Sequence, residues 1–560
     1  MDVQPGDLAL ERLKHWERTR ANAVCMTQPM GNGELREYTW AQAVDEARRM
    51  ASWLRAQNYP DRSNIAIISK NCAHWLMADW AVWMAGHVSV PLYPTLTAES
   101  VRKILEHSES RAAFIGKLDD WEAMKPGVPD AVQCISFPLS PPTDFPTWED
   151  IIRDNPPLQD LPERNAEDLA TIIYTSGTTG MPKGVMHSFG TMAWGIASGN
   201  KRFKMTAEDR VLSYLPLSHI AERLAVEIGM LHVGMHVYFA ESPDTFLQDL
   251  QRARPTFFFS VPRLWVKFKQ GVNAKMPEEK LDRLLRIPIL NRLIRKKILK
   301  GLGLDQVKFA GGGASPMPPS LLEWYKKLGL EIVEVYGMTE NLALSHSNLP
   351  GDTRPGYVGY PYEGVEARLG EDGEVQTRSP AVMLGYFKEP EKTREVMTED
   401  GFLRTGDRGE LDAEGRLRIT GRVKDIFKTS KGKYVAPAPI EDKLVAHSAV
   451  EACCVAGADR AQPFGILMLS EEALARCRDR GARDALMQDL AEYRETVNAQ
   501  LDQHERLEFL VVIEDQWTTE NGFVTPTMKV KRNVVEDHYL KHAEDWAAKR
   551  QPVVWAGPTG

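Results

Sequence analysis

Short runs of β-branched and aromatic residues alternate with segments of helical period along much of this chain. The apolar runs are residues 64–69, 112–116, 171–174, 236–240, 256–261 and 331–337. Helices are expected at 39–57, with Thr39 as N-cap, and at 315–329, where Gly329 ends the helix. Strands that are apolar throughout and separated by helices form parallel sheets with helices on both faces. The pattern therefore predicts an α/β fold.

The pattern changes at about residue 357, where short runs are separated by glycines and charged turns, as in small antiparallel strands. After residue 422 the α+β pattern returns. Because 560 residues exceed what one core serves, several domains are expected. We predict a large N-terminal domain, 1–422, of two helix-covered sheets plus a β-rich subdomain at about 357–422. A small, mobile α+β C-terminal domain, 423–560, follows, so the class is α/β with a multidomain α+β arrangement.

Charge and cysteine content exclude some functions. The net charge of -8 argues against a general nucleic-acid binder, since phosphate affinity needs clustered lysine and arginine. The six cysteines show no CxxC spacing, so neither a zinc site nor a disulfide framework is predicted. The N-terminus lacks the basic and apolar regions of a secretory signal. These features favour a cytoplasmic protein.

Two apolar segments bear on membrane contact. Residues 74–94 are interrupted by Asp79, His87 and prolines, which favours a buried helix followed by a strand over a membrane span. Residues 283–304 combine leucine and isoleucine at helical spacing with many arginines and lysines. Such a helix either lies on the inner, anionic face of a membrane or packs its apolar side on its own protein, and both alternatives stay open.

The stretch TIIYTSGTTGMPKG, residues 171–184, sets an apolar run against a loop rich in glycine and hydroxyl residues. Glycines let backbone amides approach an anion, and hydroxyl groups add donors. The loop residues Thr175, Ser176, Gly177, Thr178, Thr179 and Gly180, followed by Lys183, therefore predict a polyphosphate site. A Walker A loop is excluded, because Lys183 stands between Pro182 and Gly184.

Four more motifs follow in order: VYGMTE at 335–340, RTGDRGEL at 404–411, GRVKD at 421–425 and TPTMKVKR at 525–532. With the loop at 171–184 they resemble the adenylate-forming superfamily, which includes acyl-CoA synthetases, peptide-synthetase adenylation domains and luciferases. The resemblance extends from about residue 35 to about 545. Stretches at 213–223, 260–268 and 427–441 resemble the long-chain fatty-acid CoA ligase branch.

The resemblance implies a two-step ligase with ATP, Mg²⁺ and coenzyme A. A fatty acid of medium to long chain would attack the α-phosphorus of ATP, release pyrophosphate and pass as acyl-AMP to the thiol of coenzyme A. Three alternatives remain: an acyl-AMP ligase that loads a carrier protein, a CoA ligase for aryl or other bulky acids, and a silent lipid-binding protein. Against the last, Lys183, Glu340, Asp407 and Arg422 occur together.

The resemblance also implies roles for individual residues. Lys183, Thr339, Glu340 and Lys529 would be catalytic, and Thr178 with Glu340 would hold magnesium. Residues 175–180, Gly312, Gly313, Tyr336, Gly337, Asp407 and Arg422 would bind the nucleotide. His219, Gly311 and Ala314 would contact the acid, whose apolar channel is expected near 191–199, 213–240 and 311–315.

The second half-reaction implies a domain rotation. Lys424 and Asp425 would form the hinge, and the loop at 427–437, with Gly432 and Lys433, would replace Lys529 and admit coenzyme A. The superfamily usually has glycine before the terminal lysine, whereas this chain has Met528. Because Lys531 lies close by, Lys531 remains the alternative for that role.

Overall fold

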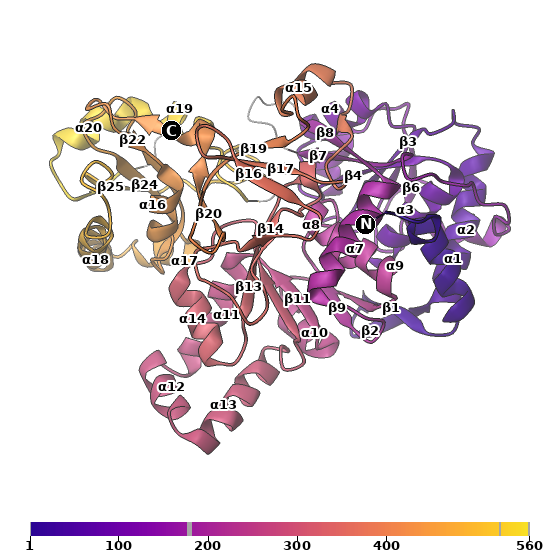
Figure 1. Cartoon of the computed structure of the whole chain (residues 1–560), viewed down its shortest axis with the longest axis horizontal. Coiled ribbons are helices and arrows are strands. Elements are labelled where there is room, and N and C mark those ends of the chain that lie inside the picture. The colour runs from indigo at the N-terminus through magenta and orange to yellow at the C-terminus, as the bar shows by residue number, and fades with distance from the viewer. Residues whose placement is uncertain (1, 176–181, 526–527, 558–560) are drawn as a thin grey trace. The chain divides into compact units, whose positions relative to one another are not determined.

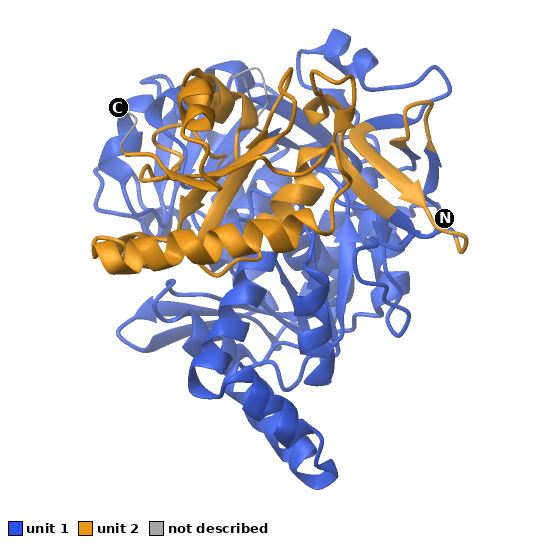
Figure 2. Cartoon of the chain, turned by 90° about the vertical axis from the view of Figure 1, so that its left-hand side faces the viewer, with its two compact units in different colours: residues 1–368, 376–404, 415–417 blue, residues 369–375, 405–414, 418–560 orange. Residues whose placement is uncertain are grey.

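The computed structural model describes residues 2–175, 182–525 and 528–557 (Figure 1). The chain forms two compact units (Figure 2). Unit 1 contains residues 1–368, 376–404 and 415–417, and unit 2 contains residues 369–375, 405–414 and 418–560. The strands β16 (Glu366–Leu369), β17 (Glu374–Arg378), β19 (Leu403–Leu411) and β20 (Leu417–Arg422) lie where the chain passes from one unit to the other.

The largest sheet of unit 1 has the strand order β18-β8-β7-β4-β3-β5-β6. Its strands are β3 (Asn64–Ile68), β4 (Val88–Leu92), β5 (Ala112–Ile115), β6 (Gln133–Ser136), β7 (Leu169–Thr175), β8 (Lys183–Ser188) and β18 (Gly385–Tyr386). Strands β3 to β7 pair in parallel, and β8 and β18 join antiparallel at one edge. The parallel, helix-covered sheet expected from the apolar runs is confirmed.

Helices α2 (Trp40–Ala56) and α3 (Ala73–Ala85) pack in the core of this unit. The hydroxyl of Thr39 accepts a hydrogen bond from the Gln42 amide at 3.3 Å, which confirms the predicted N-cap. Every residue of α3 is buried, and Gly86, with φ of 97°, ends it before β4. The predicted buried helix and following strand are therefore confirmed.

The buried Asp79 of α3 has a specific partner. It pairs with the fully buried guanidinium of Arg223, whose Nε lies 2.9 Å from Oε2 of Glu227. Arg223 begins a π-helical turn, Arg223–Ile228, after the short helix α8 (Ile220–Glu222). Burial and the nearby Asp79 raise the pKa of Glu227. The acid that interrupts the apolar segment thus belongs to an internal ion cluster.

Two more sheets complete unit 1, where the sequence predicted two in all. One has the order β2-β1-β10-β9, built from β1 (Val24–Gly31), β2 (Glu34–Thr39), β9 (Arg210–Ser213) and β10 (His236–Phe239). The other has the order β11-β12-β13-β14-β15, built from β11 (Phe257–Ser260), β12 (Phe309–Gly312), β13 (Ile332–Tyr336), β14 (His346–Ser347) and β15 (Tyr360–Pro361). The extra sheet forms around β10, one of the predicted apolar runs, which pairs with β1 on one side and with β9 on the other.

Between β11 and β12 the chain forms α11 (Pro262–Lys275) and then a pair of helices, α12 (Glu278–Leu285) and α13 (Pro288–Gly301). Figure 1 shows α12 and α13 extending away from the β11–β13 sheet. The segment expected as one helix at 283–304 is divided, because Pro288 opens a new helix. Among the described helices, none combines the length and apolarity needed to cross a bilayer.

The other helices of unit 1 are α1 (Ala9–Thr19), α4 (Ala98–Ser108), α5 (Trp121–Met124), α6 (Trp148–Asp154), α7 (Phe189–Phe203), α9 (Gly229–Val233), α10 (Phe246–Ala253), α14 (Pro319–Lys327) and α15 (Pro390–Glu395). Helix α14 is the predicted helix at 315–329, and Gly329 follows its end with φ of 84°.

Unit 2 is built on a sheet with the order β23-β24-β25-β26. Its elements are β21 (Phe427–Lys428), β22 (Tyr434–Val435), α16 (Pro437–Leu444), β23 (Val450–Ala456), β24 (Phe464–Leu469), α17 (Glu471–Arg476), α18 (Arg480–Asn498), β25 (Leu510–Ile513), α19 (Arg532–Tyr539), α20 (Ala543–Ala548) and β26 (Val553–Trp555). Alternate residues of β25 point into separate apolar clusters, one containing Leu490 of α18 and the other Val535 of α19. Helices therefore cover both faces of this sheet.

Candidate active site

The predicted phosphate loop joins two paired strands. Thr175 ends β7 and lies opposite Lys183, the first residue of β8, in the antiparallel register. Ser176, Gly177, Thr178, Thr179 and Gly180 lie outside the described residues. The loop thus leaves and re-enters the sheet at neighbouring points, with Lys183 at its exit.

Lys183 and Glu340 are connected by a tyrosine that the sequence motifs did not indicate. The Nζ of Lys183 lies 4.8 Å from the ring centroid of Tyr386, a cation–π distance. The hydroxyl of Tyr386 donates a hydrogen bond to Oε1 of Glu340 at 2.7 Å. Burial, followed by the charge of Glu340, raises the pKa of Tyr386, so the hydroxyl keeps its proton and acts as donor.

Tyr386 reaches this position through sheet pairing. Its strand β18 lies antiparallel to β8, with Tyr386 opposite Val185. Both Tyr386 and Glu340 are buried. A cation, a phenol and a carboxylate are thereby held together beside the strand that leads out of the predicted phosphate loop.

The backbone around Glu340 is tightly folded. After β13, residues Thr339–Asn341 form one 3₁₀ turn, and Leu342 and Ala343 follow with φ of 56° and 57°. A Cβ on Gly337 would lie 2.2 Å from the carbonyl carbon of Ala343, so only glycine fits there. Such over-determined backbone is found where side chains must be held in one geometry.

His187 links this turn to β8. Its Nε2 lies 2.7 Å from the carbonyl oxygen of Thr339, and because a carbonyl only accepts, Nε2 carries the proton. Burial lowers the pKa of His187 to about 4, so the ring is neutral near pH 7. No sequence motif points to His187, which lies in β8 four residues after Lys183.

The glycine run at 311–313 has a packing role in the structure. Gly311 and Gly312 belong to β12, which lies between β11 and β13. A Cβ on Gly313 would lie 2.8 Å from the carbonyl oxygen of Val335. Ala314 follows, exposed and with φ of 65°, a conformation that L-residues rarely adopt. The nucleotide and substrate roles predicted for these residues stay predictions.

An apolar cavity of about 80 Å³ lies in the same unit. Its lining residues are Gly195, Ile196, Gly199, Phe203, Met205, Ala221, Leu224, Ala225, Phe257, Phe259, Phe309, Val335, Ala343, Leu344 and Tyr362. The first two wall segments expected for an acyl channel, 191–199 and 213–240, contribute residues, whereas 311–315 does not. In place of 311–315, the cavity is lined by residues of β11 and β13 and by residues 343–344. His219, Gly311 and Ala314 are not among the lining residues.

Two chain segments contribute residues to both the polar centre and the cavity. Residues 183–203 run from Lys183 through β8 into α7, whose glycines line the cavity. Residues 332–347 run from β13 through Glu340 to Leu344. A carboxylic acid with its apolar tail in this cavity would therefore be bound by the same segments that carry the charged groups.

His219 is the N-cap of α8, and its Nδ1 accepts from the Ala221 amide at 3.2 Å. Nearby Glu222 is fully buried and accepts from the Ser213 hydroxyl at 3.0 Å and the Tyr214 amide at 2.9 Å. Burial raises the pKa of Glu222 to about 8. The substrate role predicted for His219 remains a prediction, and its cap role is a finding.

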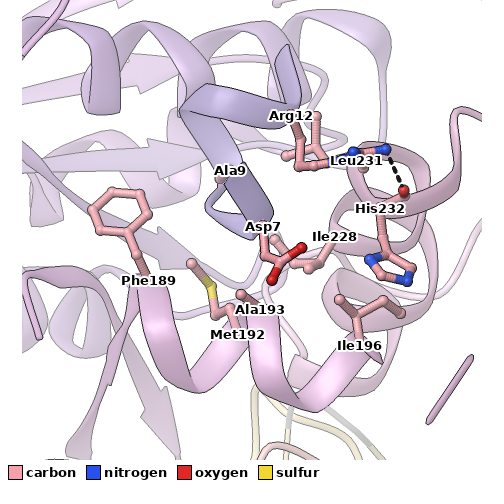
Figure 3. Close-up of a pocket in the computed structure, with 10 residues that line it drawn as sticks. All are labelled: Asp7, Ala9, Arg12, Phe189, Met192, Ala193, Ile196, Ile228, Leu231 and His232. Carbon is pink, nitrogen blue, oxygen red and sulfur yellow. Dashed lines mark hydrogen bonds between the residues drawn. The ribbon is translucent and has the colours of Figure 1, made fainter. Parts of the chain in front are cut away.

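Another cavity is lined by residues of α1, α7 and α9 (Figure 3). It measures about 10 Å³, room for about one water molecule. The side chain of Arg12 donates to the carbonyl of His232 at 2.7 Å at its edge. Ile196 lines both cavities, and this one is too small for an acyl chain.

In unit 2, Asp407 and Arg422 pair with each other. The Nε of Arg422 lies 2.9 Å from Oδ1 of Asp407, whose side chain is 11% exposed against 52% for arginine. Strands β19 and β20 carry the two residues. A half-exposed ion pair of this kind adds little stability, so the carboxylate can exchange partners at low cost.

The hinge and coenzyme A candidates lie on one continuous segment. Lys424 and Asp425 form the 3₁₀ turn Val423–Asp425, and Oδ2 of Asp425 lies 3.8 Å from Nε of Arg532. Strands β21 and β22 then form a hairpin, with Gly432 at φ of 75° in its turn and Lys433 exposed beside it. The positive φ gives a structural reason for glycine at this turn.

The terminal lysine candidates differ in exposure. Lys529 is exposed, and its carbonyl accepts from the Thr525 amide at 2.8 Å. Met528 stands before it with φ of 62°, where glycine is the favoured residue. Lys531 is half-buried and is the N-cap of α19. Lys529 is thus the more exposed of the two candidates.

Comparison with family models gives two matches. Residues 13–387 match the AMP-binding enzyme family, and residues 424–550 match the AMP-binding enzyme C-terminal domain. Among relatives, the peroxisomal long chain acyl-CoA synthetase 6 of Arabidopsis thaliana is 30% identical over 91% of this chain and 81% of its own length. The long-chain-fatty-acid–CoA ligase FadD15 of Mycobacterium bovis is 30% identical over 92% of this chain and 93% of its own length.

Solved structures share the fold. The adenylation domain of a carboxylate reductase from Mycobacterium chelonae superposes with a TM-score of 0.80 at 23% identity, covering 97% of this chain and 92% of that chain. The anthranilate CoA ligase AuaEII, in complex with anthranoyl-AMP, superposes with a TM-score of 0.77 at 22% identity, covering 98% and 100%.

Proposed function

This chain belongs to the AMP-binding enzyme family, and on that premise we propose that it is an ATP-dependent fatty acid:CoA ligase for medium to long chains. One observation supports this most. Lys183 and Glu340, which Tyr386 links, lie on two chain segments, 183–203 and 332–347, that also supply part of the lining of the apolar cavity. A carboxylate whose tail occupies the cavity would therefore meet the nucleotide next to these charged groups.

The first half-reaction joins two anions, so its catalysis is largely charge management. A carboxylate oxygen bonds to the α-phosphorus of ATP, and the bond to the bridging oxygen breaks, so pyrophosphate leaves with that electron pair. Lys183 and the 175–180 loop would hold the β- and γ-phosphates, and Thr339 the α-phosphate. Tyr336, with Gly312, Gly313 and Gly337, would border the adenine.

The residues present suit magnesium. Glu340 is a buried carboxylate with one oxygen satisfied by Tyr386, and carboxylate oxygen is the ligand type that this ion prefers. When bound by Glu340 and Thr178, the ion would neutralise charge on the phosphate oxygens. Tyr386 would orient Glu340 toward that task.

The remaining roles would fall to residues of unit 2. Asp407 would accept the ribose hydroxyls and Arg422 would contact the same sugar or the phosphate. Lys529 would neutralise the forming adenylate. A rotation at Lys424 and Asp425, with the domain boundary at 422/423, would then exchange Lys529 for the hairpin of Gly432 and Lys433, beside which the thiol of coenzyme A enters.

The cavity is the proposed acyl site. Each methylene enclosed there contributes about 0.8 kcal/mol, which favours long apolar tails over acetate. An aryl acid is the second candidate, because the rings of Phe203, Phe257, Phe259, Phe309 and Tyr362 all line the cavity and would stack with an aromatic substrate. Cytoplasm, where ATP and coenzyme A are available, is the compartment that this proposal implies.

A pyrophosphate-release assay tests the proposal. Purified protein with ATP and Mg²⁺ is given saturated fatty acids of graded length and benzoate, with and without free coenzyme A. We expect pyrophosphate with medium and long chains, and acyl-CoA by mass only when coenzyme A is present. Pyrophosphate and acyl-AMP without thioester would favour carrier-protein loading, whereas no pyrophosphate from folded protein would refute adenylation.

The lysine roles are tested by separate half-reactions. Lys529→Ala should suppress acyl-AMP formation while it spares thioester formation from supplied acyl-AMP. Lys531→Ala serves as the matched control and should leave both steps near wild type. The reverse pattern between the two variants would move the role to Lys531.

A further inference from the structure

The helix pair α12–α13 carries apolar side chains that no part of its own unit covers. Ile289 is 81% exposed, Leu293 61% and Ile287 50%, and no residue of α13 is buried. Ile289 and Leu293 are four residues apart, so they lie on one face of α13, next to the turn that holds Ile287. The end of the helix pair is therefore an exposed apolar tip, formed by Ile287, Ile289 and Leu293.

Cations surround this tip. Residues 283–304 contain no Asp or Glu, although the chain as a whole has a net charge of -8. Arg286, Arg292, Lys296, Lys297 and Lys300 are exposed, and within the described part of the chain none of the five has an ion-pair partner. By helical spacing, Lys296, Lys297 and Lys300 continue the exposed face of Ile289 and Leu293.

The acids of the neighbouring helix do not offset this charge. Glu278 pairs with Lys269 at 3.2 Å, Glu279 with Arg283 at 3.7 Å, and Asp282 with Lys327 at 2.9 Å. The inner face of α13 meets its own unit through Ile294 and Ile298, which pack on the cluster that contains Leu281. One side of α13 thus holds the helix to the protein, and the other presents apolar and cationic groups to the outside.

We propose that the α12–α13 pair docks this protein on an anionic phospholipid surface, with Ile287, Ile289 and Leu293 entering the acyl boundary. Apolar side chains flanked by lysine and arginine are the composition that binds such a surface, because the tip leaves water while the cations meet lipid phosphates. An acidic protein would offer negative charge to the lysines and arginines. It would not offer the apolar acyl layer that would bury Ile289, which is 81% exposed.

The position of the helix pair in the chain connects membrane docking to the acyl cavity. This connection rests on the proposed function. The pair is inserted between β11 and β12, the strands that bring Phe257, Phe259 and Phe309 to the apolar cavity. Long-chain acids partition into bilayers. Docking through this insertion would therefore keep the acyl site close to the phase that holds its substrate.

Vesicle flotation with the full chain tests the proposal without ATP or acid. Wild type should float with vesicles of phosphatidylcholine mixed with phosphatidylglycerol, and far less with phosphatidylcholine alone or at raised salt. Ile289→Asp/Leu293→Asp and Lys296→Glu/Lys297→Glu should each weaken vesicle binding by about tenfold or more.

Two matched controls separate the tip from general effects. Leu247→Asp changes an exposed leucine of α10, and Arg18→Glu/Lys125→Glu makes the same net charge change elsewhere in unit 1. Both should float like wild type. Release of pyrophosphate with a short, water-soluble acid should be unchanged in the tip variant, while use of a fatty acid supplied within vesicles falls.

Several outcomes would overturn the proposal: vesicle binding that survives both variants, equal loss in the controls, or no binding to anionic vesicles at all. Sedimentation velocity tests whether a second copy of the chain, rather than a lipid surface, covers the apolar tip. If the tip variant abolishes a dimer and wild type does not float, the face serves self-association instead. Flotation is read without catalysis, so a failure of the proposed ligase activity leaves the docking result standing.

Discussion

The hydroxyl of Tyr386 donates to Glu340 at 2.7 Å, although the two residues come from separate parts of the chain. The same tyrosine presents its ring to Lys183. Tyr386 is therefore a positioning residue that holds a carboxylate and a cation in one geometry. A carboxylate that is oriented in advance does not have to reorganise when charge develops on the phosphates.

Tyr386→Phe removes this hydrogen bond while it keeps the ring under Lys183. A hydrogen bond to a charged group contributes about 1.5–3 kcal/mol, so we expect adenylation to slow by about tenfold or more. The magnesium concentration needed for half-maximal pyrophosphate release should rise, a change that a merely structural defect would not produce. Tyr93→Phe, a buried tyrosine of another part of unit 1, is the control. An unchanged magnesium dependence would contradict the assigned role.

Substitutions at Gly199 and at Phe203 should shift the preferred length of the fatty acid in opposite directions. A Cβ on Gly199 would meet only Leu344, at 3.6 Å, so larger side chains enter the cavity without backbone clash. Gly199→Leu should shift the preferred fatty acid to shorter chains by several carbons. Phe203→Ala, which removes a ring 4.3 Å from that of Phe309, should extend it. Competition between acids of different length, read by mass of the acyl-CoA products, measures both shifts, and equal profiles would remove this cavity as the acyl site.

Arg223→Met should destabilise unit 1 by about 3–5 kcal/mol, because it leaves the buried carboxylates of Asp79 and Glu227 without their cation. Thermal unfolding followed by circular dichroism measures the loss. The triple variant that also carries Asp79→Asn and Glu227→Gln should recover much of it, since no buried charge remains. A single variant as stable as wild type would contradict the ion-cluster interpretation.

His187 should make stability depend on pH. Its pKa is about 4 in the fold and about 6.5 in an unfolded chain, so the unfolded state binds more protons between these values. Stability from this residue is complete above about pH 6.5 and falls by up to about 3 kcal/mol as pH drops toward 4. His187→Gln keeps an amide donor for Thr339 and cannot titrate. The Tm difference between wild type and variant should therefore change from pH 7 to pH 5 in favour of the variant, and a constant difference would refute the assignment.

The sequence predicted those features that local pattern determines. The strands beginning at Asn64 and Ala112, the N-cap at Thr39 and the buried helix before β4 are confirmed, because each depends on residues close in the chain. The family motifs also located Lys183 and Glu340 at two points that the fold brings to one place.

The roles of Tyr386 and His187 depend on residues far apart in the sequence, so local sequence pattern did not predict them. Tyr386 has no motif of its own, and its role exists only because β18 pairs with β8. In the sequence, His187 has the pattern of an ordinary strand residue. Only the structure shows its hydrogen bond to the carbonyl of Thr339. The cavity wall formed by Val335, Ala343 and Leu344 depends on two successive left-handed residues, which sequence propensity does not predict.

Helix α7 continues directly from β8, and Ser188 caps it by accepting from the Thr191 amide at 3.1 Å. One continuous segment therefore carries both Lys183 and the glycines that line the cavity. A substitution that changes which acid fits can consequently also change the rate of its activation. Replacing Gly195 pushes on Leu342, two residues from Glu340, whereas replacing Gly199 meets only Leu344. Engineering of new acid preferences would therefore begin at Gly199, where the shape of the cavity can be altered while the turn at Thr339–Asn341 keeps its form.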